Sequence, residues 1–93
     1  MARITVIKSD GFVAIDGEGY LKCDVSFLDD TVHAIQWYNT DGEIERKDAR
    51  GRMVANDAIT SLEPFESQIR AAWNAKKAEV AAAKAALENA ANG

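Results

Sequence analysis

The feature that most constrains the fold is an uninterrupted helical stretch at the C-terminal end of the sequence. Between Pro64 and Gly93 the chain has neither proline nor glycine, and residues 71–91 read AAWNAKKAEVAAAKAALENAA, about half of them alanine. Alanine has the highest intrinsic helix propensity, so one long helix is expected here. Some thirty residues at about 1.5 Å each would make a rod of roughly 45 Å.

That rod is too long for the rest of the chain. A β-domain of about fifty residues is only about 20 to 25 Å across, so about half of the helix can lie on it. The first half is suited to this, because large apolar side chains recur there at spacings of three and four. They are Leu62, Phe65, Ile69 and Trp73. We therefore expect residues 1–58 to form a small β-domain with a connector. Residues 59–93 should form a helix whose first half packs on the sheet and whose second half projects.

The start of the helix is expected between Thr60 and Pro64. Thr60 and Glu63 fit a capping box, in which each residue bonds a free backbone N–H of the other. Pro64 is tolerated in a first turn, where its missing N–H costs nothing.

The first half of the chain reads as strands and tight turns. Residues 3–7 and the run FVAID flank Asp10-Gly11, and a DG pair between such runs predicts a hairpin. A second turn follows at residues 16–19. Residues 20–25 alternate, with Leu21, Cys23 and Val25 on one face, which predicts a half-buried strand.

The fourth expected strand covers residues 32–38, VHAIQWY. His33, Ile35 and Trp37 share one face, and Val32, Ala34, Gln36 and Tyr38 share the other. Neither face is purely polar, which indicates a central strand.

After a turn, the run EIERK has only Ile44 facing inward, which is typical of a charged edge strand. Residues 48–58 show no sustained period and are expected to be a connector. The predicted class is α+β: a small antiparallel β-meander of about five strands followed by one long C-terminal α-helix.

Composition and charge exclude several functions. The net charge of −4 and the pI near 4.9 argue against a nucleic-acid binder or a protein that binds anionic membranes. The sequence has no signal-peptide pattern and no apolar run as long as a membrane span. We expect the chain to be made and kept in the cytoplasm, or packed into a particle assembled there.

No residue pattern predicts catalysis, a metal site or a cofactor. Cys23 and His33 are the only cysteine and the only histidine. Each is better interpreted as an ordinary part of a small β-domain than as a nucleophile or a metal ligand. The carboxylates lie in or beside turns without the spacing of a calcium loop. We therefore expect a protein that is not an enzyme.

Surface recognition is the remaining possibility, and the helix is its main candidate. A thin heptad-like stripe runs along it, with residues four and three apart. Its members are Ile69, Trp73, Lys76, Val80, Ala83, Leu87 and Ala90. The far half could pack on a partner or remain a solvated, partly frayed tail.

Two aromatic residues of the fourth strand divide between core and surface. Trp37 is expected in the core, while Tyr38 points to the opposite face. Tyr and Trp often anchor interfaces. The predicted interface residues are therefore Tyr38, Ile69, Trp73, Val80, Ala83 and Leu87.

The runs IDGEGY, VHAIQWY, GEIE and NDAITSLEPF, followed by a helix with a tryptophan, resemble small phage proteins encoded near tail-fibre and tail-tip genes. The resemblance covers roughly residues 4–75. It implies a virion or tail-assembly role: a small structural or adaptor protein of the tail tip or tail-fibre region, without enzymatic activity. The implied location is the virion tail, and the host cytoplasm during assembly.

The implied partners are other copies of the chain, other phage tail proteins, or both. Tail tips and fibres are commonly threefold or sixfold, which favours a homotrimer formed through the helix. Two alternatives stay open: a tail-fibre assembly chaperone that is absent from the mature particle, and a small acidic inhibitor of a host defence protein.

Overall fold

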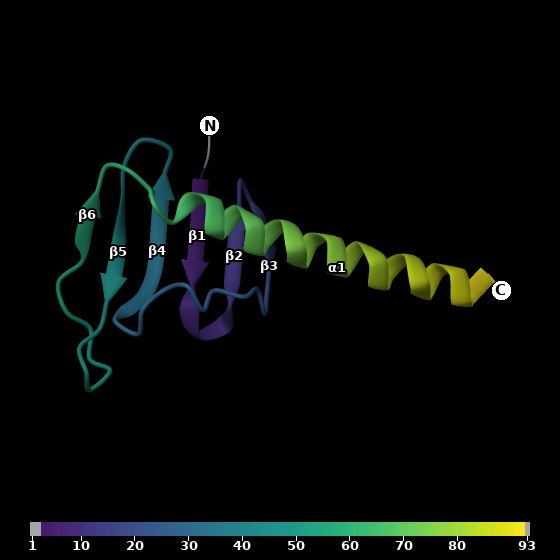
Figure 1. Cartoon of the computed structure of the whole chain (residues 1–93), viewed down its shortest axis with the longest axis horizontal. Helices are drawn as coiled ribbons and strands as arrows, with labels where there is room; N and C mark the ends of the chain where they lie inside the picture. The colour runs from purple at the N-terminus through teal and green to yellow at the C-terminus, as the bar shows by residue number, and fades with distance from the viewer. Residues whose placement is uncertain (1–2, 93) are drawn as a thin grey trace.

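The computed structural model describes residues 3–92 and, for the side chains, residues 3–89. Its elements in chain order are β1 (Arg3–Ile7), the 3₁₀ turn η1 (Lys8–Asp10), β2 (Phe12–Ile15), β3 (Glu18–Tyr20), β4 (Val32–Tyr38), β5 (Gly42–Arg46), β6 (Asp57–Ile59) and α1 (Glu66–Asn92). The predicted α+β class, an antiparallel sheet followed by one long C-terminal helix, is confirmed (Figure 1).

The six strands form one antiparallel sheet in the order β3-β2-β1-β4-β5-β6. The sheet therefore consists of two three-stranded meanders that meet where β1 pairs with β4. This differs from a single meander of about five strands. The chain has to pass from the β3 edge to the middle of the sheet before β4 can begin.

Both predicted Gly turns of the first meander are present, and each has a backbone that requires glycine. Gly11 has φ 60, and a Cβ there would lie 2.8 Å from the carbonyl oxygen of Cys23. Asp16 and Gly17 have φ 51 and 89 and join β2 to β3. Two successive positive φ values match the right-handed twist of the flanking strands, so this tight two-residue loop is favoured.

The prediction of a strand over residues 20–25 is wrong. Strand β3 ends at Tyr20, and residues 21–31 cross the sheet face to reach β4. Lys22 takes a positive φ of 60, and the Cys23 N–H donates to the Gly11 carbonyl instead of to a neighbouring strand. Two of the alternating apolar residues, Cys23 and Val25, are buried because the crossing segment turns them toward the core. The third, Leu21, is 61% exposed.

Strand β4 is central, as predicted, but its two faces differ from the expected ones. The pairing with β5 shifts between Val32 and Ala34, which marks a β-bulge. The bulge gives His33 no partner of its own in that ladder, so Val32 joins Ile35 on the core face instead of sharing a face with Ala34.

Strand β5 is not the edge that its charges predicted. Its outer side pairs with β6, whose first two residues belong to the stretch expected to be a connector and whose last, Ile59, belongs to the segment expected to be the helix. So short a strand shows no readable alternation, which is why sequence periodicity missed it. The expectation for Ile44 is correct, since it is the one buried residue of β5.

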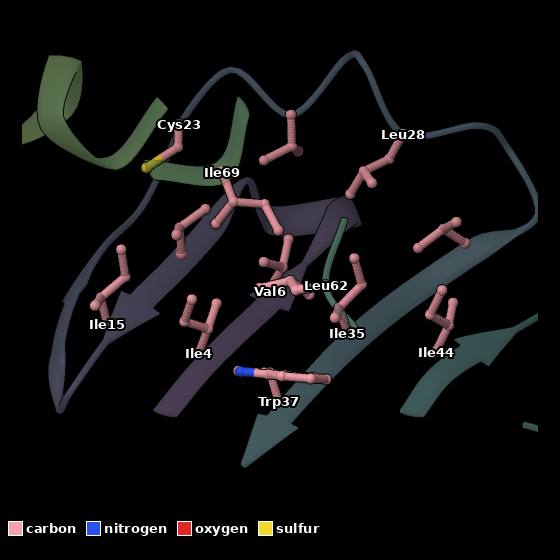
Figure 2. Packing of buried hydrophobic residues seen from close by; sticks show 13 residues of the cluster. Ile4, Val6, Ile15, Cys23, Leu28, Ile35, Trp37, Ile44, Leu62 and Ile69 are labelled. Atoms are coloured by element: carbon pink, nitrogen blue, oxygen red, sulfur yellow. The ribbon is translucent and has the colours of Figure 1, made fainter. Parts of the chain in front are cut away.

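The core lies on one face of the sheet, beneath the crossing segment and the first part of the helix (Figure 2). Apolar side chains of the four strands β1, β2, β4 and β5 meet there with Cys23, Val25 and Leu28 from the crossing, and Leu62 and Ile69 from the C-terminal part. The strand residues are Ile4, Val6, Val13, Ile15, Val32, Ile35, Trp37 and Ile44. Trp37 is thus a core residue, as predicted.

Helix α1 begins at Glu66, later than predicted, and without the Thr60–Glu63 capping box. A turn precedes it, in which the N–H groups of Phe65 and Glu66 both donate to the Leu62 carbonyl. Leu62 is 2% exposed, so its burial fixes where the chain can turn into the helix. The helix then runs for 27 residues, about 40 Å, across the strands and past β3 (Figure 1).

Candidate protein interface on the projecting helix

The first two turns of α1 belong to the core, which corrects one predicted interface residue. Ile69 is fully buried against the sheet of its own chain. Its side chain is therefore not available to a partner. The stripe that the sequence assigned to an interface begins as an intramolecular contact.

Trp73 holds the helix where it leaves the sheet, at the β3 edge. Its indole Nε1–H donates to the carbonyl oxygen of Glu18 at 2.8 Å. Its ring meets that of Tyr20 edge to face, with centroids 5.8 Å apart. Such a pair contributes about 0.5 to 1.5 kcal/mol beyond burial. Trp73, one of the predicted interface residues, therefore makes its contacts within its own chain, at the boundary between helix and sheet.

A charged pair lies next to this contact. The Lys77 ammonium is 3.3 Å from the Glu18 carboxylate and 4.7 Å from the centre of the Trp73 ring. The Tyr20 hydroxyl donates to the same carboxylate. The hydrogen bond from Tyr20 lowers the pKa of Glu18, and Lys77 lowers it further. The same hydrogen bond raises the pKa of Tyr20. The helix thus leaves the sheet in a direction fixed by aromatic, hydrogen-bond and ionic contacts.

Beyond this point the helix has no cover. Lys76 is half-buried, and every residue from 77 to 89 is exposed. Val80 is 46% exposed and Leu87 is 72% exposed, with Ala83 between them. We call residues 77–92 the overhang.

The apolar side chains of the overhang continue the sheet-facing side of the helix. Ile69 and Ala83 are two heptads apart, and Trp73, Val80 and Leu87 follow one another at intervals of seven. Because seven residues return to nearly the same side of an α-helix, within about 20°, these residues share one face. The face that packs on the sheet therefore extends into solvent past β3.

Tyr38 does not join this group. Its Cα pairs with Arg3 on β1, next to the core pair of Ile4 and Trp37, so its side chain lies on the opposite face of the sheet. It is 46% exposed, and the Arg3 guanidinium lies 5.6 Å from its ring centre. Tyr38 remains an interface candidate, but for a different surface.

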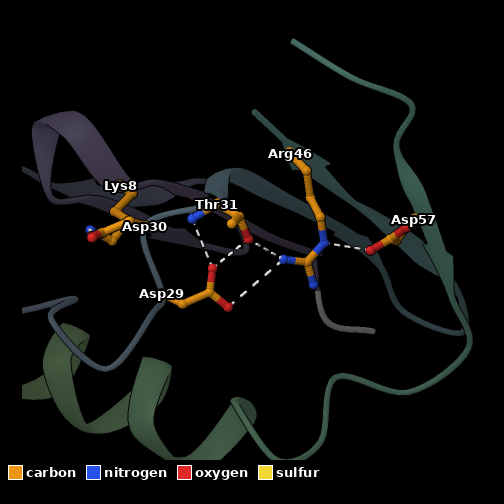
Figure 3. A network of polar contacts seen from close by, with 6 residues as sticks. All are labelled: Lys8, Asp29, Asp30, Thr31, Arg46 and Asp57. Carbon is orange, nitrogen blue, oxygen red and sulfur yellow. Dashed lines mark hydrogen bonds and ion pairs between the residues drawn. The ribbon is translucent and has the colours of Figure 1, made fainter. Parts of the chain in front are cut away.

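One polar network was not anticipated from the sequence (Figure 3). Arg46 on β5 donates from Nη1 to the Thr31 hydroxyl at 2.7 Å and from Nε to Asp57 on β6. Asp29 accepts the Thr31 N–H at 2.8 Å and lies 3.8 Å from Arg46. The network joins the crossing segment to β5 and to the edge strand β6. No sequence signal marks it, because its members are spread over residues 29–57.

An open hollow of about 490 Å³ lies beside the network. Its lining carries charges of both signs and no single ligand chemistry follows from it. The lining residues are Asp30, Thr31, Lys47, Asp48, Ala49 and Gly51.

The one cysteine is placed for packing. Cys23 is 6% exposed and touches the core cluster, and burial raises the pKa of its thiol. A raised pKa disfavours the thiolate that nucleophilic chemistry needs. Within the described residues, no group of three or more His, Cys, Asp or Glu side chains is arranged to hold a metal ion.

Comparison with known proteins gave no matching family model, no matching curated protein and no matching solved structure. Over the described part of the chain, no helix combines the length and the apolar character needed to cross a membrane.

Proposed function

We propose that this chain is a non-enzymatic component of a phage virion, a small structural or adaptor protein of the tail tip or tail-fibre region that acts by protein–protein assembly. Two kinds of support have to be kept apart. The assembly role is supported by the overhang. The phage tail setting is supported by the sequence resemblance alone.

The observation that carries the assembly role is that every residue from 77 to 89 is exposed, on a helix whose earlier turns are packed. An isolated helix of about 12 to 15 residues is only marginally stable in water, even when rich in alanine. The overhang therefore gains stability from a partner that covers its apolar side. Val80 and Leu87 would then contribute apolar burial, at about 25 cal/mol per Å².

Light scattering on the purified chain tests self-assembly. The monomer mass is 10.1 kDa, and we expect a mass at least twice this at high micromolar concentration. The double variant Val80→Asp/Leu87→Asp should return to the monomer mass while keeping its sheet. A clean monomer at high micromolar concentration would contradict assembly through copies of the chain.

Mass spectrometry of purified virions tests the tail assignment. We expect the chain in the mature particle. Its absence, together with co-purification with a fibre protein from infected cells, would instead assign the assembly chaperone. Specific recovery of a host defence protein in a pull-down would assign the inhibitor.

A further inference from the structure

The two edges of the sheet differ in what surrounds them. The β3 edge lies under helix α1, which contacts β2 and β3 and continues past them as the overhang (Figure 1). Within the described chain no helix lies over β6, because α1 begins over the middle of the sheet and runs toward the opposite edge. A strand added beside β6 would therefore not meet the helix of the same chain.

The backbone of β6 presents hydrogen-bonding groups to this open side. The Val54 N–H donates to the Arg46 carbonyl, so Arg46 directs its backbone groups away from β4. Backbone groups alternate along a strand, so Ile44 directs its own to the same side, where it pairs with Asp57. The next residue of β6, Ala58, must then direct its N–H and its carbonyl outward, past the last strand of the sheet.

The β6 edge also lacks the features that usually keep sheet edges apart. Lysine or proline on an edge strand commonly prevents pairing, and residues 53–62 contain neither. The one charge in this stretch is Asp57, whose carboxylate accepts a hydrogen bond from Arg46. Next to it, Met53 and Val54 are 51% and 46% exposed. The ligand that fits such an edge is a polypeptide in an extended conformation, which supplies matching main-chain groups.

The charges at the two ends of this edge make it complementary to its own reverse. Residues 47–52, before the edge, carry three positive and one negative side chain, whereas residues 60–66, after it, carry two negative and no positive ones. Among the described residues, neither the Arg50 guanidinium nor the Glu63 carboxylate has a hydrogen-bond or ion-pair partner. Two antiparallel copies of the edge bring opposite charges together at both ends. Two parallel copies would bring like charges together, which lowers affinity.

We propose that a second copy of the chain binds at this edge, with the two β6 strands antiparallel around Ala58. Each Ala58 N–H then donates to the Ala58 carbonyl of the other copy, and Asp57 comes opposite Ile59, so no like charges face each other directly. The basic segment of each copy, with Arg50, lies beside Glu63 of the other. The two sheets become one, and the overhangs point away from each other at its far ends.

The pair should be weak, because β6 has three residues and supplies few main-chain hydrogen bonds. Its contact area is well below the roughly 800 Å² per partner of a stable interface, so we expect a Kd of about 1 mM or weaker. Copies held in an assembly reach effective concentrations in the millimolar range, where such a contact still forms. In this respect the inference rests on the proposed assembly function.

Amide exchange measured by NMR tests the pair without the overhang if the Val80→Asp/Leu87→Asp variant is used. In dilute protein the outward Ala58 amide should exchange fast. At millimolar concentration its exchange should slow at least about threefold, because the second copy then bonds it. The Gly19 amide, in the middle of the other edge strand, is the matched control and should not change with concentration.

Charge-swap variants in the same background test the orientation by sedimentation equilibrium. Arg50→Glu and Glu63→Arg should each raise the Kd at least about threefold, because the twofold axis repeats every new like-charge contact. The two changes combined in one chain should restore the Kd to within about twofold, because each attraction is re-formed with its signs exchanged. In a parallel pair neither single variant would change the Kd much, since like charges would face each other before and after.

Ala58→Pro should abolish the pair, because it removes the outward donor while leaving the hydrogen bonds to β5. If this variant fails to fold, the charge-swap series decides. Exchange at Ala58 that does not depend on concentration, or an unchanged Kd in both single charge variants, overturns the inference. If the wild-type chain still assembles at high micromolar concentration, the proposed function stands without the edge pair. Protection of Ala58 in a chain that is monomeric there would keep the edge pair and remove assembly through the overhang.

Discussion

The two halves of helix α1 have similar local propensity but different reasons to be helical. The half from Glu66 to Lys76 is held by tertiary packing through Ile69 and Trp73. Beyond Lys77, every residue of the overhang up to 89 is exposed, and its helicity relies on alanine. The comparison teaches that a continuous helix can combine a half held by its own fold and a half that the fold leaves exposed. Substitutions at matched positions should separate the two.

The largest contrast is expected between Ile69→Ala and Leu87→Ala. Removing the fully buried Ile69 side chain should lower the free energy of unfolding by about 2 to 5 kcal/mol. Removing the exposed Leu87 side chain should change it by less than about 0.5 kcal/mol in the monomer. Urea denaturation at low micromolar concentration measures both. Equal losses would mean that the overhang packs on its own sheet.

A smaller loss is expected at the point where the two halves meet. Trp73→Phe keeps an aromatic ring beside Tyr20 but removes the donor to the Glu18 carbonyl. A hydrogen bond of this kind contributes about 0.5 to 1.5 kcal/mol, so the unfolding free energy should fall by about that amount. Trp37→Phe in the core is the matched control. A loss at Trp73 below the error of the urea titration would show that the indole N–H does not hold the helix.

Glycine substitutions should separate global from local stability. Ala71 and Ala82 are both exposed, one in each half. Ala71→Gly should cost about 0.5 to 1 kcal/mol of global stability, because the packed half unfolds with the sheet. Ala82→Gly should instead lower helical circular dichroism and amide protection after residue 77 only, since the overhang can open by itself. A matching global loss for Ala82→Gly would contradict that independence.

The smallest effect concerns acid, and it belongs to the β-domain. Hydrogen bonds from Thr31 lower the pKa of Asp29, and those from Ser26 lower the pKa of Asp24. A folded-state pKa below the unfolded value of about 3.9 gives stability that is complete above pH 5 and is lost as the pH falls through the folded pKa.

Asp29→Asn should therefore reduce the drop in urea midpoint between pH 7 and pH 3, with Asp30→Asn as the exposed control. An unchanged drop in the Asp29 variant would show that this carboxylate does not contribute to the acid loss.

Sequence reasoning was most reliable where local chemistry decides the structure. The DG pairs predicted the hairpin turns because few residues accept positive φ, and the alanine run predicted the helix because propensity adds over many residues. It failed at the crossing segment, at β6 and at the helix start. In each case a long-range contact decides: Cys23 with Gly11, β5 with β6, and Leu62 with the core.

The interface candidates divide in the same way. The exposure of Val80, Ala83 and Leu87 was predictable from the size mismatch between helix and sheet. The burial of Ile69 was also indicated, by the apolar spacing of the first half of the helix, and the separate face of Tyr38 by the alternation of residues 32–38. The residue at which packing on the sheet gives way to exposure depends on where α1 crosses the sheet, which no residue pattern encodes.

The direction of that crossing has a mechanical consequence. Because α1 runs across the strands, tension applied at its far end acts along the hydrogen bonds between strands, not along the strands themselves. Such a load peels ladders apart one at a time, beginning with the three-residue strand β3 that carries the Glu18–Trp73 contact. A force applied at the end of α1 therefore acts first on the ladder between β2 and β3, which is the shorter of the two ladders in that meander. Strand β3 should be the first strand to detach under load.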